Sequence, residues 1–181
     1  MSRIGKQPVQ VPSGVNVDID GRTVTVKGPK GTLTDTFHAD MAVKTDNGAV
    51  TVERPSDAGE HKALHGLTRN LIANMVTGVS EGYARSLELV GVGYRVQQSG
   101  KGIKLSVMLS HEVDYQPQDG ISIAVEGNNL IHVSGISKQA VGQTAAEIRK
   151  VRPPSVYTGK GIRYRGEQVR LKPGKSARRV V

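Results

Sequence analysis

The fold of this chain is indicated first by two short stretches that resemble each other, "HGLTRNLI" at residues 65–72 and "VGQTAAEI" at residues 141–148. Displaced by 76 residues, they align Gly66 with Gly142, Thr68 with Thr144, and Ile72 with Ile148. Both stretches have helical periodicity. A repeat of this length is a domain rather than one unit of a solenoid. The sequence therefore predicts two similar domains that arose by internal duplication.

Each stretch is predicted to lie on an amphipathic helix. The apolar face of the first helix contains Ala63, Leu64, Leu67, Leu71 and Met75. Asp57 and Glu60 have capping-box spacing, so this helix should begin near residue 57 or 58. The corresponding face of the second helix contains Val141, Thr144, Ala145, Ile148 and Val151. Pro153 should end the second helix, because the residue before a proline disfavours the helical region.

Short strands are predicted before each helix. Alternating apolar and polar residues indicate strands at 15–19, 23–28, 41–45 and 49–53, and in the second half at 86–96, 103–109, 121–125 and 130–135. The equivalence of strands between the halves stays open, since residues 14–28 also match residues 120–135. The expected fold class is α+β: two similar domains at 1–81 and 82–152, each a small antiparallel sheet covered on one face by one helix, and a basic extension at 153–181.

Composition excludes several classes of protein. The chain of 181 residues has no cysteine, which excludes disulfides and thiolate metal sites. No apolar run approaches the roughly 18 residues of a membrane span, and the first residues lack the apolar centre of a signal peptide. The chain is therefore expected in the cytoplasm, without a membrane partner.

The net charge of +9 is concentrated towards one end of the chain. Residues 1–137 carry 13 Lys and Arg against 14 Asp and Glu, whereas residues 138–181 carry 12 Lys and Arg against only Glu147 and Glu167. A segregated basic segment favours a nucleic acid partner, because each neutralised phosphate releases counterions. A solvated basic tail with no partner is the alternative.

No motif indicates catalysis or a bound cofactor. "PGKS" at 173–176 lacks the first glycine of a phosphate loop, and "GVG" at 91–93 lacks the third glycine of a dinucleotide fingerprint. His61 and His65 have the spacing of zinc ligands without a third ligand, so both are placed on the polar side of the first helix. The sequence predicts no enzyme, no catalytic residue, no cofactor, no metal and no small-molecule substrate.

The chain closes with "VRPPSVYTGKGIRYRGEQVRLKPGKSARRVV" at residues 151–181, a segment too rich in Gly, Pro and cations to be expected in the core of its own domain. Glycines on both sides of Lys160 let backbone N–H groups approach phosphate. Arg163 and Arg165 flank Tyr164, so guanidinium groups can bind phosphates. Tyr157 and Tyr164 either stack on unpaired bases or pack on the second sheet.

Five blocks in order along the chain carry a resemblance: "MSRIGKQPVQVPSGV" (1–15), "VTVKGPKG" (24–31), "LHGLTRNLIANMVTGV" (64–79), "LELVGVGYR" (87–95) and "RPPSVYTGKGIRY" (152–164). Together they resemble the bacterial large-subunit ribosomal protein six family. The resemblance implies a duplicated, non-catalytic structural component of the large ribosomal subunit that binds large-subunit ribosomal RNA mainly through its second domain and tail. It also implies a position near the sarcin–ricin loop, where translation factors dock, among neighbouring ribosomal proteins.

The closing block departs from the family at three positions. Ser155 and Val156 stand where family members usually have an acidic residue and often a proline, and Thr158 stands where lysine is usual. Thr158 removes one candidate phosphate contact and leaves the role of that position open.

The expected RNA contacts are mainly cations of the closing segment: Arg152, Tyr157, Lys160, Arg163, Tyr164, Arg165, Arg170, Lys172, Lys175, Arg178 and Arg179, with Lys138, Tyr94 and Arg95 as further candidates. Phosphate contacts position a protein rather than read bases, so recognition should depend on RNA shape. The alternative is a DNA-binding or regulatory protein, which would need a recognition helix, and for this role the second helix offers Gln143, Arg149 and Lys150.

Overall fold

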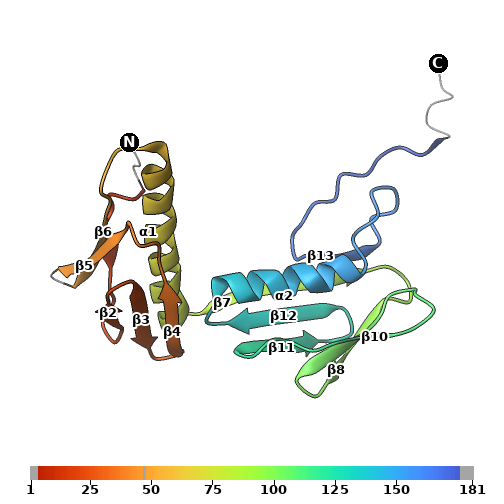
Figure 1. Ribbon diagram of the computed structural model, residues 1–181. Helices are drawn as coiled ribbons and strands as arrows, with labels where there is room; N and C mark the ends of the chain where they lie inside the picture. Colours follow the sequence, from red (N-terminus) through yellow and green to blue (C-terminus); the bar gives the residue numbers. More distant parts are fainter. Residues whose placement is uncertain (1–3, 47, 176–181) are drawn as a thin grey trace. The chain divides into compact units, whose positions relative to one another are not determined.

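The computed structural model describes residues 4–46 and 48–175 (Figure 1). The chain divides into two compact units, one made of Met1–Tyr83 with Ile136–Lys138 and the other of Ala84–Gly135 with Gln139–Val181. Helices and small antiparallel sheets make up both units, which confirms the α+β class. Within the described residues, neither helix is long and apolar enough to span a membrane.

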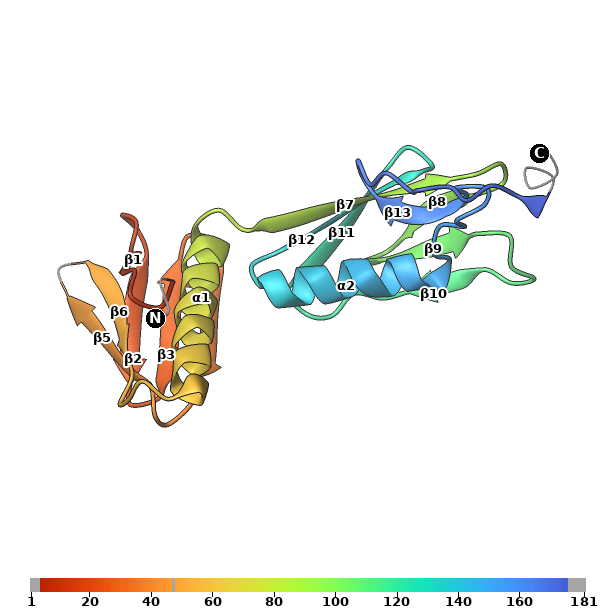
Figure 2. The same cartoon turned by 90° about the horizontal axis from the view of Figure 1, so that it is seen from above.

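The first unit contains two three-stranded sheets with the strand orders β2-β3-β4 and β1-β6-β5. Its strands are β1 (Val9–Gln10), β2 (Asn16–Asp20), β3 (Thr23–Gly28), β4 (Gly31–Thr36), β5 (Ala42–Asp46) and β6 (Ala49–Glu53). Helix α1 (Gly59–Ser80) contacts both β3 and β6 (Figure 2). Alternation in these two strands places Val24, Val26 and Val50 in one core with Ile72 of α1.

The buried face of α1 overlaps the predicted one only in part: Met75 is buried, and Leu64 and Leu71 are partly buried against the core, whereas Ala63 and Leu67 are exposed. The buried residues are His65, Thr68, Ile72, Met75, Val76, Gly78 and Val79, while Leu67 is 53% exposed. His65 is therefore not on the polar side of the helix. Its Nε2–H donates to the Val52 carbonyl at 2.8 Å, and Arg54 donates to its Nδ1 at 2.8 Å. The helix turns a polar ring inwards because both ring nitrogens have partners there.

The predicted capping box is also wrong. The residue before α1 is Ala58, which makes no side-chain capping bond, and the helix begins at Gly59. Asp57 accepts instead from the Arg54 guanidinium at 2.6 Å. The Asp57 carboxylate thus makes its charge-assisted hydrogen bonds with a guanidinium instead of with the N–H groups of the first helical turn.

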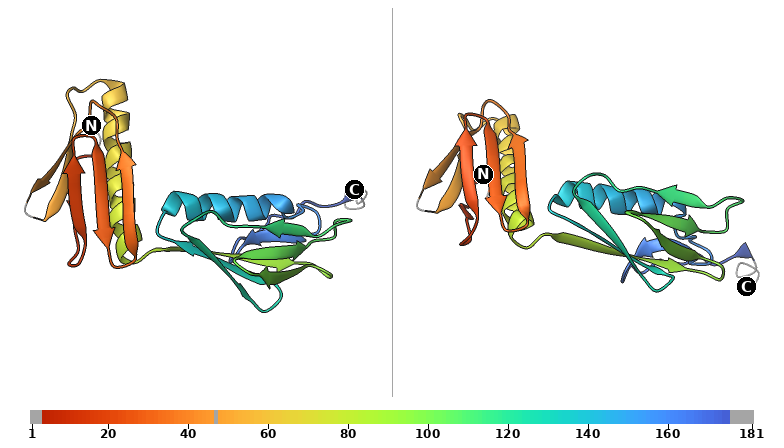
Figure 3. Two further views of the ribbon diagram at one scale, coloured as in Figure 1. Left: turned by 60° about the horizontal axis from the view of Figure 1, so that its bottom comes forward. Right: turned by 90° about the horizontal axis from the view of Figure 1, so that it is seen from below.

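The second unit contains a four-stranded sheet ordered β11-β12-β7-β13 and a three-stranded sheet ordered β10-β9-β8. Most of its strands are drawn in green to blue in Figure 3. Its strands are β7 (Tyr83–Val90), β8 (Arg95–Ser99), β9 (Gly102–Ser106), β10 (Val113–Tyr115), β11 (Ile121–Glu126), β12 (Leu130–Gly135) and β13 (Gly161–Tyr164). The single strand predicted at 86–96 is thus two strands, separated by residues 91–94.

Helix α2 (Lys138–Val151) follows the prediction closely. Its buried residues are Val141, Thr144, Ala145 and Ile148, and it ends at Val151, two residues before Pro153. The core of this unit also contains Leu87, Leu89, Ile131 and Val133 of the four-stranded sheet. Helix α2 runs along the four-stranded sheet, beside β12, in Figure 1 and Figure 3.

Strand β13 corrects the expectation that the closing segment stays outside the core. It pairs antiparallel with β7, and its Ile162 is completely buried. Gly161 makes this entry possible at φ 146°, because a Cβ there would lie 2.6 Å from the Cα of Pro154. Strand alternation turns Ile162 inwards although its neighbours are glycine and arginine. The basic composition of the segment therefore gave no indication of this four-residue strand.

Candidate nucleic-acid interface

The closing segment is fixed to the second unit at both ends of β13. The N–H of Ile162 donates to the Arg152 carbonyl at 2.8 Å, and the N–H of Arg165 donates to the Ser86 carbonyl at 2.9 Å. The backbones of Arg152 and Arg165 are therefore hydrogen-bonded to strands of the sheet.

Residues 153–160, here called the closing loop, fold back on themselves before β13. The N–H of Ser155 donates to the Lys160 carbonyl at 2.9 Å, and the N–H of Gly159 donates to the Ser155 carbonyl at 2.8 Å. The hydroxyl of Thr158 accepts from the N–H of Lys160 at 3.4 Å. Lys160 is consequently presented by an ordered turn, which lowers the entropy lost when it binds a partner.

The chain after β13 returns beside the closing loop. The N–H of Lys172 donates to the Val156 carbonyl at 2.7 Å. Tyr157, which is 61% exposed, lines a surface hollow of about 670 Å³ together with Lys172 and Lys175. The ring of Tyr157 is therefore outside the core and beside two cations.

Two arginines of this region pair with the unit's own carboxylates. Arg163 forms an ion pair with Glu88 directly across the β7–β13 ladder. Arg149 of α2 binds Glu167 through two nitrogens, at 2.6 and 3.3 Å, and its guanidinium lies 5.6 Å from the ring centre of the half-buried Tyr164. The hydrogen bond from Arg149 holds the pKa of Glu167 below its usual value. Arg163 and Tyr164 thus take part in the structure of the unit itself.

The other cations of the closing segment keep their charge available. Among residues 4–46 and 48–175, no carboxylate pairs with Arg152, Lys160, Arg165, Arg170, Lys172 or Lys175. All six are exposed. The predicted Arg178 and Arg179 lie outside the described residues. An exposed group of cations on a fixed backbone is the electrostatic arrangement expected of a phosphate-binding surface.

The three further candidates for RNA contact, Lys138, Tyr94 and Arg95, differ in their surroundings. Lys138 belongs to the first unit, where its Nζ donates to Asn74 at 3.1 Å and lies 5.6 Å from the ring centre of Tyr83. Tyr94 accepts from Nε of Arg152 at 3.4 Å, so it lies beside the closing loop. The bond to Arg152 brings Tyr94 to the group of exposed cations, whereas the partners of Lys138 are residues of the first unit.

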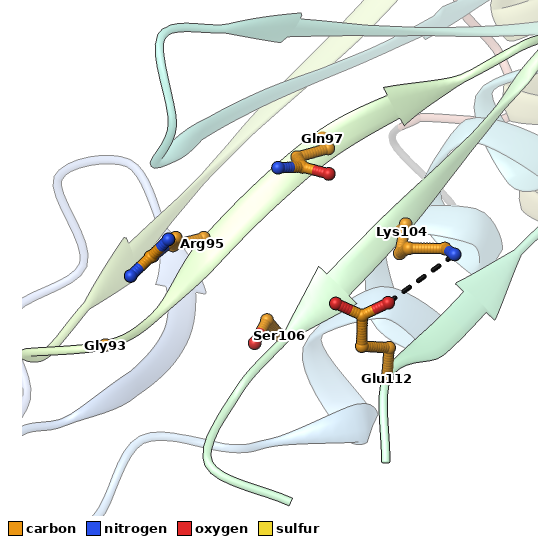
Figure 4. A pocket seen from close by; sticks show the side chains of 6 residues that line it. All are labelled: Gly93, Arg95, Gln97, Lys104, Ser106 and Glu112. Atoms are coloured by element: carbon orange, nitrogen blue, oxygen red, sulfur yellow. Dashed lines mark ion pairs between the residues drawn. The ribbon is translucent and has the colours of Figure 1, made fainter.

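Arg95 lies in a different hollow, on the β8–β9 hairpin, with a volume of about 240 Å³ (Figure 4). Lys104 across this hollow is held by Glu112 at 3.5 Å and by Asp114 at 3.9 Å. The side chain of Arg95 lies apart from this ion pair in Figure 4, and no described carboxylate pairs with it. The hollow therefore contains one neutralised and one available cation.

Sequence reasoning missed the internal partners of the closing segment. Glu167 is one of only two acidic residues after position 137. An isolated carboxylate among so many cations could have indicated an internal ion pair, which it forms with Arg149. The pairing of Arg163 with Glu88 had no comparable signal, because it depends on the register of a strand that was not predicted.

Comparison with known proteins agrees with the division of the chain into two similar parts. The sequence profile of the family described as Ribosomal protein L6 matches residues 11–82 and again residues 90–165. The large ribosomal subunit protein uL6 of Caldicellulosiruptor saccharolyticus is 57% identical over 178 residues, which cover 98% of each chain. The proteins of the same name from Halalkalibacterium halodurans and Geobacillus stearothermophilus are 56% and 57% identical over 178 residues, covering 98% of this chain and 100% of their own.

The two matched segments confirm the predicted duplication, and the second segment extends through β13 to residue 165. The relatives are named as ribosomal proteins, which bears out the expectation that the chain is not an enzyme. Identity at this level over nearly the whole length also confirms the resemblance seen in the sequence blocks. The chain belongs to the ribosomal protein L6 family.

Proposed function

We propose that this chain is a structural component of the large ribosomal subunit in the cytoplasm and binds large-subunit ribosomal RNA through its second unit and closing segment. The observation that carries the proposal is the group of six exposed cations without a described carboxylate partner, on a segment fastened by β13. The relatives' names assign them to the large ribosomal subunit. Neighbouring ribosomal proteins are further partners in this proposal.

In this proposal the parts of the chain have different roles. Residues 1–81 form a domain with few RNA contacts, because its 9 cations balance its 9 acidic residues. Residues 82–152 form the platform, and residues 153–181 are the RNA-binding extension. The first part of that extension is fastened to the platform by β13. The proposed position is near the sarcin–ricin loop and the docking region of translation factors.

The contacts proposed here act on phosphates and confer affinity and orientation rather than base reading. If the six available cations each engage one phosphate, affinity for a duplex should fall by about three decades between 50 and 200 mM salt. A DNA-reading role finds less support on α2: Gln143 donates to Glu147 at 2.8 Å, and Arg149 is held by Glu167. Two of the three side chains that this role required are thus engaged.

The test is filter binding of the full chain to deproteinised large-subunit ribosomal RNA and to duplex DNA at the same salt concentrations. Lys160→Gln and Arg165→Gln should each reduce the magnitude of the salt slope by about one. Arg22→Gln and Lys27→Gln are matched controls, since both cations are exposed and lie in the first unit, and they should leave the slope unchanged. Equal affinity for duplex DNA, or equal effects of the controls, would contradict the proposal.

A further inference from the structure

A second hollow beside the closing loop has a chemical character that phosphate binding does not explain. Its volume is about 310 Å³, and three segments line it: Val92 and Tyr94 between β7 and β8, Met108 after β9, and part of the loop region. The loop region contributes Arg152, Ser155, Thr158 and Lys160. The volume is at the small end of the roughly 300–1,000 Å³ typical of ligand sites.

Two apolar side chains at this hollow are unusually exposed. Val92 is 86% exposed and Met108 is 67% exposed. Met108 also has φ 58°, which is uncommon for a residue other than glycine, and its Sδ would lie 3.3 Å from a Cβ placed on Gly93. Left-handed backbone at a bulky residue is a conformation that tends to occur at functional sites. Contact with an apolar surface of a partner would remove both side chains from water.

Two hydroxyl groups at the hollow have unused donors. Ser155 Oγ accepts from the N–H groups of Tyr157 at 3.3 Å and Thr158 at 3.4 Å, and Thr158 Oγ1 accepts from the N–H of Lys160. Neither hydroxyl donates to a described residue. A hydroxyl carries one donor besides its acceptor lone pairs, so both O–H groups are available to an acceptor on a partner.

The charge of the hollow is positive. Arg152 and Lys160 have no carboxylate partner among the described residues, and Arg152 is oriented by its bond to the Tyr94 hydroxyl at 3.4 Å. The occupant therefore combines an apolar face, hydrogen-bond acceptors and negative charge within a small volume. An unstacked nucleotide has these three properties in its base face, its base-edge and sugar oxygens, and its phosphate.

We propose that this hollow binds one unpaired nucleotide of the RNA, with its base against Val92 and Met108 and its phosphate beside Arg152 and Lys160. The proposal rests on the proposed function and specifies what part of the RNA the site takes. A continuous duplex presents phosphates and sugars outwards and keeps its base faces stacked, so it offers no apolar surface to these two side chains.

The experiment uses the full chain carrying Val92→Ala and Met108→Ala together. Both side chains are exposed, so the substitutions remove little from the core. Leu67→Ala is the matched control, an exposed apolar residue of α1 in the first unit. Affinity for deproteinised large-subunit ribosomal RNA is measured over a series of salt concentrations. Reagents that modify the Watson–Crick edges of unpaired bases report protection of single nucleotides.

The double variant should bind about tenfold more weakly with an unchanged salt slope, because it loses base contact and no phosphate contact. One unpaired nucleotide protected by the wild-type chain should become reactive again, while the Leu67→Ala control keeps wild-type affinity and protection. Wild-type affinity of the double variant, or a wild-type chain that protects no unpaired nucleotide, would overturn the nucleotide site and leave phosphate binding intact. Failure of the wild-type chain to bind RNA would overturn the proposed function itself.

Discussion

Ile162 is the residue through which the closing segment enters the core, and its replacement by alanine tests that role directly. Its side chain is completely buried. Its N–H is bonded to the Arg152 carbonyl at 2.8 Å, and its register partner is Leu89 on β7. Alanine keeps these backbone bonds, so the substitution removes packing alone.

The expected loss follows from the atoms removed. Ile162→Ala deletes three carbon atoms, each worth about 0.8 kcal/mol of transfer free energy, or about 2.4 kcal/mol in all. The cavity left behind adds to this, and measured losses for such changes are about 2–5 kcal/mol. We expect the free energy of unfolding of the second unit to fall by about 3 kcal/mol, a large part of the roughly 5–15 kcal/mol typical of a folded protein.

The assay is urea denaturation of the full chain, followed by amide hydrogen exchange with peptides assigned to each unit. Exchange should accelerate in peptides of β7, β12 and α2, and stay unchanged in the first unit. Val156→Ala is the control, because this closing-loop side chain is 41% exposed and should change stability by less than about 0.5 kcal/mol. If Ile162→Ala and the wild type have the same urea midpoint of unfolding, β13 is not part of the cooperative core.

Three further changes test other parts of the structure. Gly161→Ala should destabilise the second unit by about 1–3 kcal/mol in thermal or urea unfolding, because alanine is strained at φ 146° and its Cβ would clash with Pro154. Wild-type stability of this variant would contradict the close approach of Gly161 to Pro154. Glu167→Gln should lower stability near neutral pH. The lowered pKa of Glu167 means that its ion pair with Arg149 stabilises the fold above the unfolded pKa of roughly 4.3 and ceases to do so as the pH falls through the native value. Variant and wild type should therefore converge in acid, and a constant difference in urea titrations across pH would refute this. His65→Ala should cost the first unit about 3 kcal/mol in urea unfolding, because it leaves a cavity and removes the partner of the buried Val52 carbonyl; a loss below about 1 kcal/mol would show that the ring is dispensable.

The elements that sequence patterns identified well are those in which apolar periodicity coincides with burial. In α2 the predicted residues Val141, Ala145 and Ile148 are the buried ones, because the opposite face is polar and leaves a single apolar stripe. The strands at Thr23–Gly28 and Ala49–Glu53 were found for the same reason, as valine alternates there with polar residues. The duplication also followed from the sequence, since the spacing of 76 residues depends on residue identities rather than on contacts.

Helix α1 shows where periodicity alone fails. Its sequence is apolar on more than one side, so both a stripe through Leu67 and a stripe through Ile72 have helical spacing. The structure buries the second stripe, in which His65 and Thr68 contribute polar groups. Burial of His65 depends on the Val52 carbonyl and on Arg54, which come from a neighbouring strand and its following turn. No pattern within the helix contains that information.

The closing segment combines residues of the unit's own structure with the cations proposed to bind RNA, within one short strand and its flanks, so its composition alone did not reveal its fold. Alternation in "GIRY" assigns one residue to the core and the next to an ion pair, while the cations outside the strand keep their charge. A free tail with the same charge would have to lose conformational entropy on binding, and anchoring through β13 removes part of that cost in advance. Removing residues 152–181 would therefore alter the platform as well as its charge, and a chain shortened after Gln168 is the better test of the distal cations because it keeps both β13 and Glu167.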